Sequence, residues 1–154
     1  MRLHSLNIVA IEKDSNDEFK PILDGYKKMI SRYAKLQTVE LFNKKISQSQ
    51  KKGEKEAKKS YSEAFEPYLA RYNVFLHERG EMLDSLEFSK IFQDNSEIRF
   101  FIGGAYGFDE RFLKKADKVI SLSKMTTSHK IAKLMLYEQI YRALTIVNKH
   151  PYHK

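Results

Sequence analysis

Cysteine is absent from this 154-residue chain, and no apolar run is long enough to span a bilayer. The lack of cysteine excludes disulfides, a thiolate nucleophile and a cysteine-based zinc site. Because a transmembrane helix needs roughly 20 consecutive apolar residues, none is predicted. The apolar stretch 3–11 is interrupted by Asn7 and followed by Glu12 and Lys13, which indicates a first β-strand rather than a signal peptide. We therefore expect a cytoplasmic protein with no membrane partner.

Several enzyme signatures are missing as well. The chain has no Gly-x-Ser-x-Gly nucleophile elbow, and its five histidines form no His-x-x-x-His pair on a helix. The glycine turn at 103–107 has neither the spacing of a dinucleotide fingerprint nor the Gly-Lys-Ser/Thr of a Walker loop. His150 and His153 lie in a tail interrupted by Pro151, so a surface tail or a basic tail that faces the substrate is favoured over a metal site.

Acidic residues are scarce in the last third of the chain. Residues 1–97 hold 17 basic and 16 acidic side chains, whereas residues 98–154 hold 11 basic and only 4 acidic ones. From Lys118 onward, seven Lys or Arg residues accompany the single carboxylate of Glu138. This uneven charge predicts that the C-terminal part faces a polyanion, most commonly through its phosphates. The simpler interpretation, that the charge only keeps the protein soluble, stays open.

Strand and helix patterns alternate along the chain, whose length suits one domain. Apolar and β-branched residues predict strands at 3–11, 38–46, 71–76, 98–102 and 118–122. Apolar residues spaced by three and four, behind capping residues at 15–18, Ser85, Asp109 and Ser128, predict helices over 19–33, 64–69, 85–92, 109–116 and 128–149. The polar segment 47–60 is predicted to be a mobile loop that runs into the charged start of a helix. The pattern indicates a single α/β domain with a mainly parallel sheet flanked by helices.

Three segments are expected to meet at the carboxyl edge of this sheet: the strand end at Leu76, the turn that begins at Gly103 and the loop 122–127. Ligands in open α/β sheets bind at that edge. Glycines allow backbone to approach a ligand closely, although a structural turn is the simpler explanation of Gly103 and its neighbours. The loop 122–127 combines hydroxyl and backbone donors with a thioether. Such a loop suits a polar ligand that contains a ring.

Four ordered motifs carry a resemblance to a known family. They are Phe-x-Ile-Gly-Gly-x-x-Gly at 100–107, Ser-Leu-Ser-Lys-Met-Thr at 121–126, Leu-x-Glu-Gln-x-Tyr-Arg-Ala at 136–143 and the closing Tyr-His-Lys at 152–154. With a thinner match upstream, at Leu76, Gly80 and 85–88, the chain resembles the RlmH family of SPOUT methyltransferases, which modify large-subunit ribosomal RNA. Ordered matches over a whole chain are far more specific than any single loop.

The resemblance implies one domain of 1–154 whose region of about 71–154 is threaded into a deep trefoil knot and holds the cofactor, in a protein that works as a homodimer. It also implies S-adenosylmethionine as methyl donor, no metal, and N3 of a pseudouridine in 23S ribosomal RNA as acceptor, with the assembled ribosome as the preferred substrate. By the same analogy, the cofactor contacts fall on Leu76, Gly103, Leu122, Ser123, Lys124, Met125, Thr126 and Thr127.

Basic residues of the last helix and the tail are the candidates for the RNA side of the site. We expect RNA contacts from Lys133, Arg142, Tyr152, His153 and Lys154. Arg142 and His153 are the candidate catalytic residues, because a base or a cation would assist loss of the N3 proton during methyl transfer. Arg142 follows apolar helix positions, so it needs a carboxylate, a helix C-terminus or a phosphate as partner.

The chain departs from the family pattern at a few positions. His77 stands where an acidic residue is usual, Thr127-Ser128 replaces a segment with a proline, and Lys133 replaces an arginine. The last change weakens a bidentate phosphate contact, which only arginine makes. Two other functions stay open: a non-catalytic basic protein that binds RNA or the ribosome, and an enzyme acting on a phosphorylated metabolite. The concentration of charge in 98–154 favours a large polyanion over a metabolite.

Overall fold

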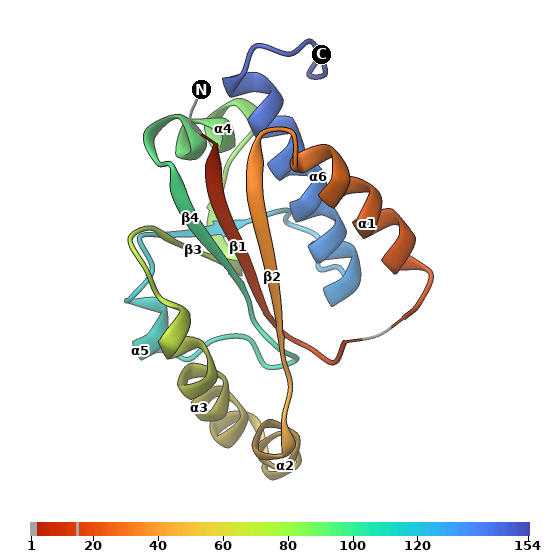
Figure 1. The fold of residues 1–154 in the computed structure, drawn as a ribbon. Helices are drawn as coiled ribbons and strands as arrows, with labels where there is room; N and C mark the ends of the chain where they lie inside the picture. The colour runs from red at the N-terminus through yellow and green to blue at the C-terminus, as the bar shows by residue number, and fades with distance from the viewer. Residues whose placement is uncertain (1–2, 15) are drawn as a thin grey trace.

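The computed structural model describes residues 3–14 and 16–154 and forms an α/β domain around one parallel sheet (Figure 1). The strand order is β2-β1-β4-β3-β5, and every pairing is parallel. The strands are β1 His4–Ile11, β2 Ala34–Leu41, β3 Asn73–Met82, β4 Glu97–Ile102 and β5 Lys118–Ser121. The predicted fold class is therefore confirmed. The trefoil knot and the domain bounds stay predictions.

Helices cover both faces of the sheet. They are α1 Phe19–Ile30, α2 Lys44–Lys52, α3 Glu54–Phe65, α4 Ser85–Asp94, α5 Glu110–Leu113 and α6 His129–Val147, with a 3-10 turn at Glu66–Tyr68. Alternate residues of β1 divide the core: Leu6 and Ile8 join the cluster under α1, α4 and α6, whereas Val9 joins the cluster under α2, α3 and α5. None of the helices in the described residues is long and apolar enough to cross a membrane.

Three strands lie side by side at the carboxyl edge, where β4 and β5 end, whereas β3 continues to Met82 and does not end at Leu76 as predicted. Leu76 of β3 pairs with Ile102 of β4 on one side and with Ile120 of β5 on the other. Ile120 pairs a second time, with Glu81, because β3 bulges between these two pairings. A Cβ on Gly80 in this bulge would lie 2.6 Å from the backbone of Ile120, so the close crossing of the two segments requires glycine.

The segment 42–60 differs from its prediction. The second strand ends at Leu41 rather than near residue 46. The predicted mobile loop is wrong, because its residues form α2, whereas the predicted charged helix start is confirmed as the first half of α3. Asn43 caps α2 by accepting a hydrogen bond from the Ile46 N–H at 2.8 Å. Ile46 is the one buried residue of α2, whereas α3 buries Ala57, Tyr61 and Phe65, so α2 is the less firmly anchored of the two helices.

Two of the predicted helix caps are confirmed, at Asp109 and at Ser128. The helix after Asp109 ends at Leu113, earlier than the predicted 116. Helix α4 is capped by Asp84 rather than by the predicted Ser85, in a reciprocal pair of hydrogen bonds with Glu87. The predicted capping segment 15–18 includes Ser15, which lies outside the described residues.

Candidate functional site

The carboxyl ends of β3, β4 and β5 bring most of the predicted cofactor residues together. Leu76, Ile102 and Ile120 are aligned across the three strands, so Gly103 and the loop 122–127 follow at the same edge. Leu76, Gly103, Leu122 and Ser123 are half-buried, whereas 124–127 are exposed. The described residues thus form a shallow edge of backbone and hydroxyl groups beside a half-buried leucine.

The conformation or the close packing of the turn 103–107 explains each of its three glycines, Gly103, Gly104 and Gly107. Gly107 has a φ of 75°, in the region that favours glycine, and its N–H donates to the Gly104 carbonyl at 3.0 Å. A Cβ on Gly104 would lie 2.6 Å from the ring of Tyr61, and one on Gly103 would lie 3.0 Å from the Gly107 Cα. The turn therefore holds the backbone of Gly103 at the strand end, between β3 and α3.

The loop 122–127 is organised by its own hydroxyl groups. The Ser121 hydroxyl donates to the Ser123 carbonyl at 2.9 Å, and the Met125 N–H donates to the Ser123 hydroxyl at 3.0 Å. Among the described residues, no group accepts a hydrogen bond from the N–H of Lys124 or Thr126. The Met125 side chain, in a residue that is 80% exposed, packs on nothing sizeable. The loop thus presents free main-chain donors and an apolar side chain to a ligand.

His77 follows Leu76 directly and faces the same edge. Its Nδ1 accepts a hydrogen bond from the Arg79 N–H at 3.0 Å, so the neutral ring carries its proton on Nε2. Burial and the nearby charge of Arg79 lower the pKa of His77 below its ordinary value. The residue that replaces the family's usual acid is therefore held as a neutral donor beside the candidate cofactor residues.

The C-terminal tail packs on α6 through a cluster of four side chains: Glu138, Arg142, Tyr152 and His153. Arg142 donates to Glu138 at 2.6 and 3.0 Å, lies 4.8 Å from the ring centroid of Tyr152, and donates to Nδ1 of His153 at 3.0 Å. Tyr152 also packs edge-on against Tyr141 and donates to Glu138 at 3.1 Å. Hydrogen bonds donated to the Glu138 carboxylate raise the pKa of Arg142, which keeps the guanidinium charged.

This cluster defines what His153 offers to a substrate. Because a guanidinium only donates, Nδ1 of His153 must be the acceptor, and the neutral ring carries its proton on Nε2. A general-base role for His153 therefore requires Nδ1 to leave Arg142. The carboxylate of Glu138, not a phosphate, is the partner that Arg142 has in this conformation.

Within one chain, the tail lies far from the candidate cofactor edge. Helix α6 begins at the loop 122–127 and runs back to the other end of the sheet, where the C-terminus lies near the N-terminus (Figure 1). Arg142 is 14 residues beyond Ser128, which corresponds to about 20 Å along the helix axis. The structure of one chain therefore does not bring the predicted RNA and cofactor residues together.

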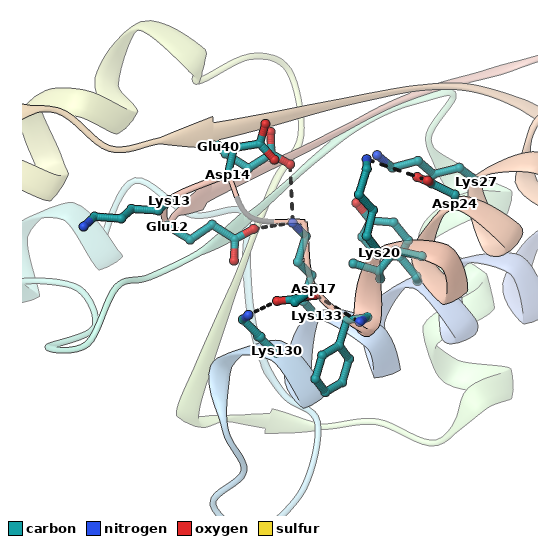
Figure 2. Close-up of a pocket in the computed structure, with 13 residues that line it drawn as sticks. Glu12, Lys13, Asp14, Asp17, Lys20, Asp24, Lys27, Glu40, Lys130 and Lys133 are labelled. Carbon is teal, nitrogen blue, oxygen red and sulfur yellow. Dashed lines mark hydrogen bonds and ion pairs between the residues drawn. The ribbon is translucent and has the colours of Figure 1, made fainter.

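Sequence reasoning missed a small cavity of about 60 Å³ at the carboxyl ends of β1 and β2. Most of its lining residues are charged, and Figure 2 shows Lys133 pointing toward Glu12 and Glu40 while Lys130 points toward Asp17. Lys133 pairs with Glu12 and with Glu40, the latter at 3.4 Å, and Lys130 pairs with Asp17. Two carboxylates at the ends of neighbouring parallel strands were the sequence signal for this cluster.

The ammonium group of Lys133 thus pairs with the carboxylates of Glu12 and Glu40, and its side chain is only 8% exposed. Burial raises the pKa of Glu12, but hydrogen bonds and charge from His129 and Lys133 outweigh it, so the pKa lies below its ordinary value. RNA binding by Lys133 stays a prediction, and in this conformation its ammonium group has no room for a phosphate beside Glu12.

Comparison with known proteins gives a match over almost the whole chain. The family model described as "Predicted SPOUT methyltransferase" matches residues 4–153. Proteins named "Ribosomal RNA large subunit methyltransferase H" from Campylobacter concisus, Aliarcobacter butzleri and Campylobacter jejuni serotype O:23/36 are 47%, 48% and 51% identical to it. Each alignment covers 97% of this chain and 99% of the relative.

Proposed function

Because the chain belongs to the SPOUT methyltransferase family, we propose that it transfers a methyl group from S-adenosylmethionine to large-subunit ribosomal RNA. The acceptor in this proposal is N3 of a pseudouridine on the assembled ribosome, and the enzyme is a cytoplasmic homodimer. The observation that carries it is the alignment of Leu76, Ile102 and Ile120, which places Gly103 and the loop 122–127 at one edge. Three relatives named as ribosomal RNA methyltransferases support the substrate class.

The residues at this edge fit S-adenosylmethionine by their chemistry. The free N–H groups of Lys124 and Thr126 suit the acceptor atoms of an adenine ring or a carboxylate, and Met125 and Leu76 suit the apolar faces of the ligand. These groups need no metal to bind such a molecule. When bound, the donor supplies an electrophilic methyl group on a sulfonium, and the protein has to align this group with the acceptor nitrogen.

The basic cluster on α6 and the tail is proposed to hold the acceptor. Loss of the N3 proton leaves negative charge on the base, which the permanently charged Arg142 would stabilise. His153 would take the proton at Nδ1 after leaving Arg142, and Tyr152 offers a ring and a hydroxyl to the RNA. Phosphate contacts are assigned to Lys154 and, if its internal pairs open, to Lys133.

A homodimer follows from the separation of these two groups. The tail and the loop 122–127 lie at opposite ends of α6, so a complete site needs the tail of one protomer beside the loop of another. Helix α6 carries exposed apolar residues, Ile131 and Met135, one turn apart on one face. Burial of such a face against a second copy would supply the interface.

The first test is titration of the purified protein with S-adenosylmethionine by calorimetry, with two proline variants. Thr126→Pro removes a main-chain donor that no described residue uses, and should weaken binding about ten-fold or more. Ser128→Pro is the matched control, because its φ of −64° accepts proline and the family usually has proline in this segment. It should bind like the parent.

Each outcome assigns a function. Binding by the parent that is lost in Thr126→Pro, followed by detection of methylated pseudouridine in treated large ribosomal subunits by mass spectrometry, supports the proposal. A folded parent that binds RNA but no S-adenosylmethionine is a non-catalytic RNA-binding protein. Binding that is equal in Thr126→Pro moves the cofactor away from this loop.

A further inference from the structure

We propose that the hairpin of α2 and α3 is a second RNA-binding surface, which holds the phosphate backbone of the ribosomal RNA beside the candidate cofactor edge. This inference deepens the proposed function and rests on its substrate class. It concerns residues 44–59, which the basic C-terminal third and the tail do not include.

The hairpin is a defined structure rather than a loose basic loop. Helices α2 and α3 run antiparallel, and Lys45 near the start of α2 pairs with Glu63 near the end of α3. The Gln50 amide donates to the Tyr61 hydroxyl at 2.6 Å across the pair. Ile46 and Ala57 anchor one face in the core. The opposite face is consequently fixed in space and turned to solvent.

That outer face carries an excess of positive charge. Residues 44–59 hold seven lysines and only two carboxylates, Glu54 and Glu56. Lys44, Lys51, Lys52 and Lys55 are exposed, and no carboxylate among the described residues pairs with them. The rest of residues 1–97 is negative overall, so the lysines form a local patch and not part of an even basic surface.

The C-terminal half of α3, which follows the lysines, contacts the glycine turn at the candidate cofactor edge. Tyr61 of α3 packs so closely on the glycine turn that a Cβ on Gly104 would lie 2.7 Å from its hydroxyl. Ser62 donates to Asp109 at 2.7 Å just after that turn. Figure 1 shows α2 and α3 at the end of the molecule opposite the C-terminal tail.

The chemistry of the patch favours RNA over other polyanions. A membrane-binding helix needs exposed apolar residues beside its lysines, whereas the apolar residues of this hairpin face the core. The lysines stand among Ser47, Gln48 and Ser49, whose hydroxyl and amide groups are common donors to phosphate and ribose. In this proposal the lysines hold the RNA strand that flanks the methylated nucleotide.

The test compares charge-removing variants of equal size. Lys51→Gln with Lys52→Gln and Lys55→Gln removes three of the exposed charges, and the control Lys28→Gln with Lys35→Gln and Lys90→Gln removes three exposed lysines outside the hairpin. Binding of protein-free 23S ribosomal RNA is measured from 50 to 200 mM salt, and methylation of large ribosomal subunits gives KM and kcat. Affinity for S-adenosylmethionine is measured for every variant.

The hairpin variant is expected to bind RNA about ten- to a hundred-fold more weakly than the parent at about 0.1 M salt. The slope of log affinity against log salt should fall by about two to three. KM for large subunits should rise while kcat and the affinity for S-adenosylmethionine stay unchanged. Replacement of the same three lysines by arginine should retain RNA binding, since arginine keeps the charge.

Three results would overturn the inference. Equal losses in the hairpin and control variants would mean general charge attraction without a defined surface. Weaker binding to large subunits with unchanged binding to protein-free RNA would assign the hairpin to an acidic ribosomal protein. Unchanged RNA affinity would leave the lysines without a binding role. A parent that binds RNA but lacks methyltransferase activity would contradict the proposed function and leave the hairpin inference standing.

Discussion

Lys133 links two acidic strand ends to the last helix. Its ammonium group pairs with Glu12 after β1 and with Glu40 at the end of β2, and His129 lies 3.2 Å from Glu12 on the same helix. A lysine that is only 8% exposed is costly to bury unless its charge is compensated. We infer that these contacts fix the first turn of α6, and with it the end of the loop 122–127.

Glu12 should make the stability of the protein sensitive to acid. Its pKa in the folded state lies below the ordinary 4.5, so its contribution is fully present above that value and is lost as the pH falls through the folded pKa. Glu12→Gln should cost about 2 kcal/mol at pH 7, because Lys133 loses a partner in a mostly buried site. It should also lose less stability than the parent on acidification below pH 4.5.

Urea unfolding at pH 7 and at several values below pH 4.5 measures both effects. Glu54→Gln is the control, since the Glu54 carboxylate also pairs with a lysine but lies on the surface, where ion pairs contribute little. Identical acid sensitivity in the parent and in Glu12→Gln would show that other carboxylates control the acid transition.

At the scale of elements, Gly53 joins α2 to α3 with a conformation that other residues avoid. Its φ is 117°, and no atom lies within 4 Å of a Cβ built there, so any penalty of substitution comes from the backbone alone. Gly53→Ala should destabilise the protein by about 1–3 kcal/mol. It should also weaken RNA binding if the hairpin holds the RNA backbone.

Gly25 provides the opposite case in the same chain. It lies within α1, and a Cβ there would also meet nothing within 4 Å, but its φ is not positive. Gly25→Ala should therefore stabilise the protein by about 0.5–1 kcal/mol, since alanine loses less entropy in a helix. Thermal unfolding of both variants measures whether each substitution raises or lowers the stability of the protein. A destabilised Gly25→Ala or an unaffected Gly53→Ala would contradict this account.

The sequence predicted the elements whose apolar pattern is strong and missed those held by few anchors. Strand β4 and helix α6 have continuous apolar signals, and both are confirmed within about two residues. Helix α2 buries only Ile46, so its sequence resembles a polar loop and its helical state depends on Asn43 and on packing. The edge formed by Leu76, Gly103 and the loop 122–127 was predictable because parallel strands end together.

The contacts of long side chains were not predictable from the sequence. The pairs of Lys133 join residues 121 and 93 positions apart in the chain, and no local pattern specifies them. Similarly, the motif around Arg142 suggested a partner of unknown kind, and only the packed helix shows that Glu138, four residues earlier, provides it. Such pairs depend on how α6 lies on the sheet, which periodicity does not determine.

At the scale of the whole molecule, charged residues are gathered in patches that the net charge of a long segment does not show. Residues 1–97 are almost neutral in sum, yet they contain a lysine-rich hairpin and an acidic remainder. The hairpin and the basic tail lie at opposite ends of the molecule. In a homodimer that pairs the tail of one protomer with the loop of another, both positive surfaces would flank one RNA strand.

Exchange between protomers tests this arrangement. A chain that lacks residues 150–154 and the Thr126→Pro chain should each be inactive as homodimers, the first without the tail and the second without a cofactor loop. Mixed dimers of the two contain one complete pair of intact loop and intact tail, so methylation of large ribosomal subunits should reappear. The mixture is prepared by co-expression with two affinity tags and purified on both.

Adding Ile131→Asp and Met135→Asp to both chains provides the control. Two carboxylates on this exposed face of α6 would be expensive to bury in an interface, so the mixed dimer should not form and activity should stay absent. Light scattering reports the oligomeric state in each case. Mixed dimers that form but remain inactive would place the tail and the loop in separate sites, and the tail would then have no role in methyl transfer.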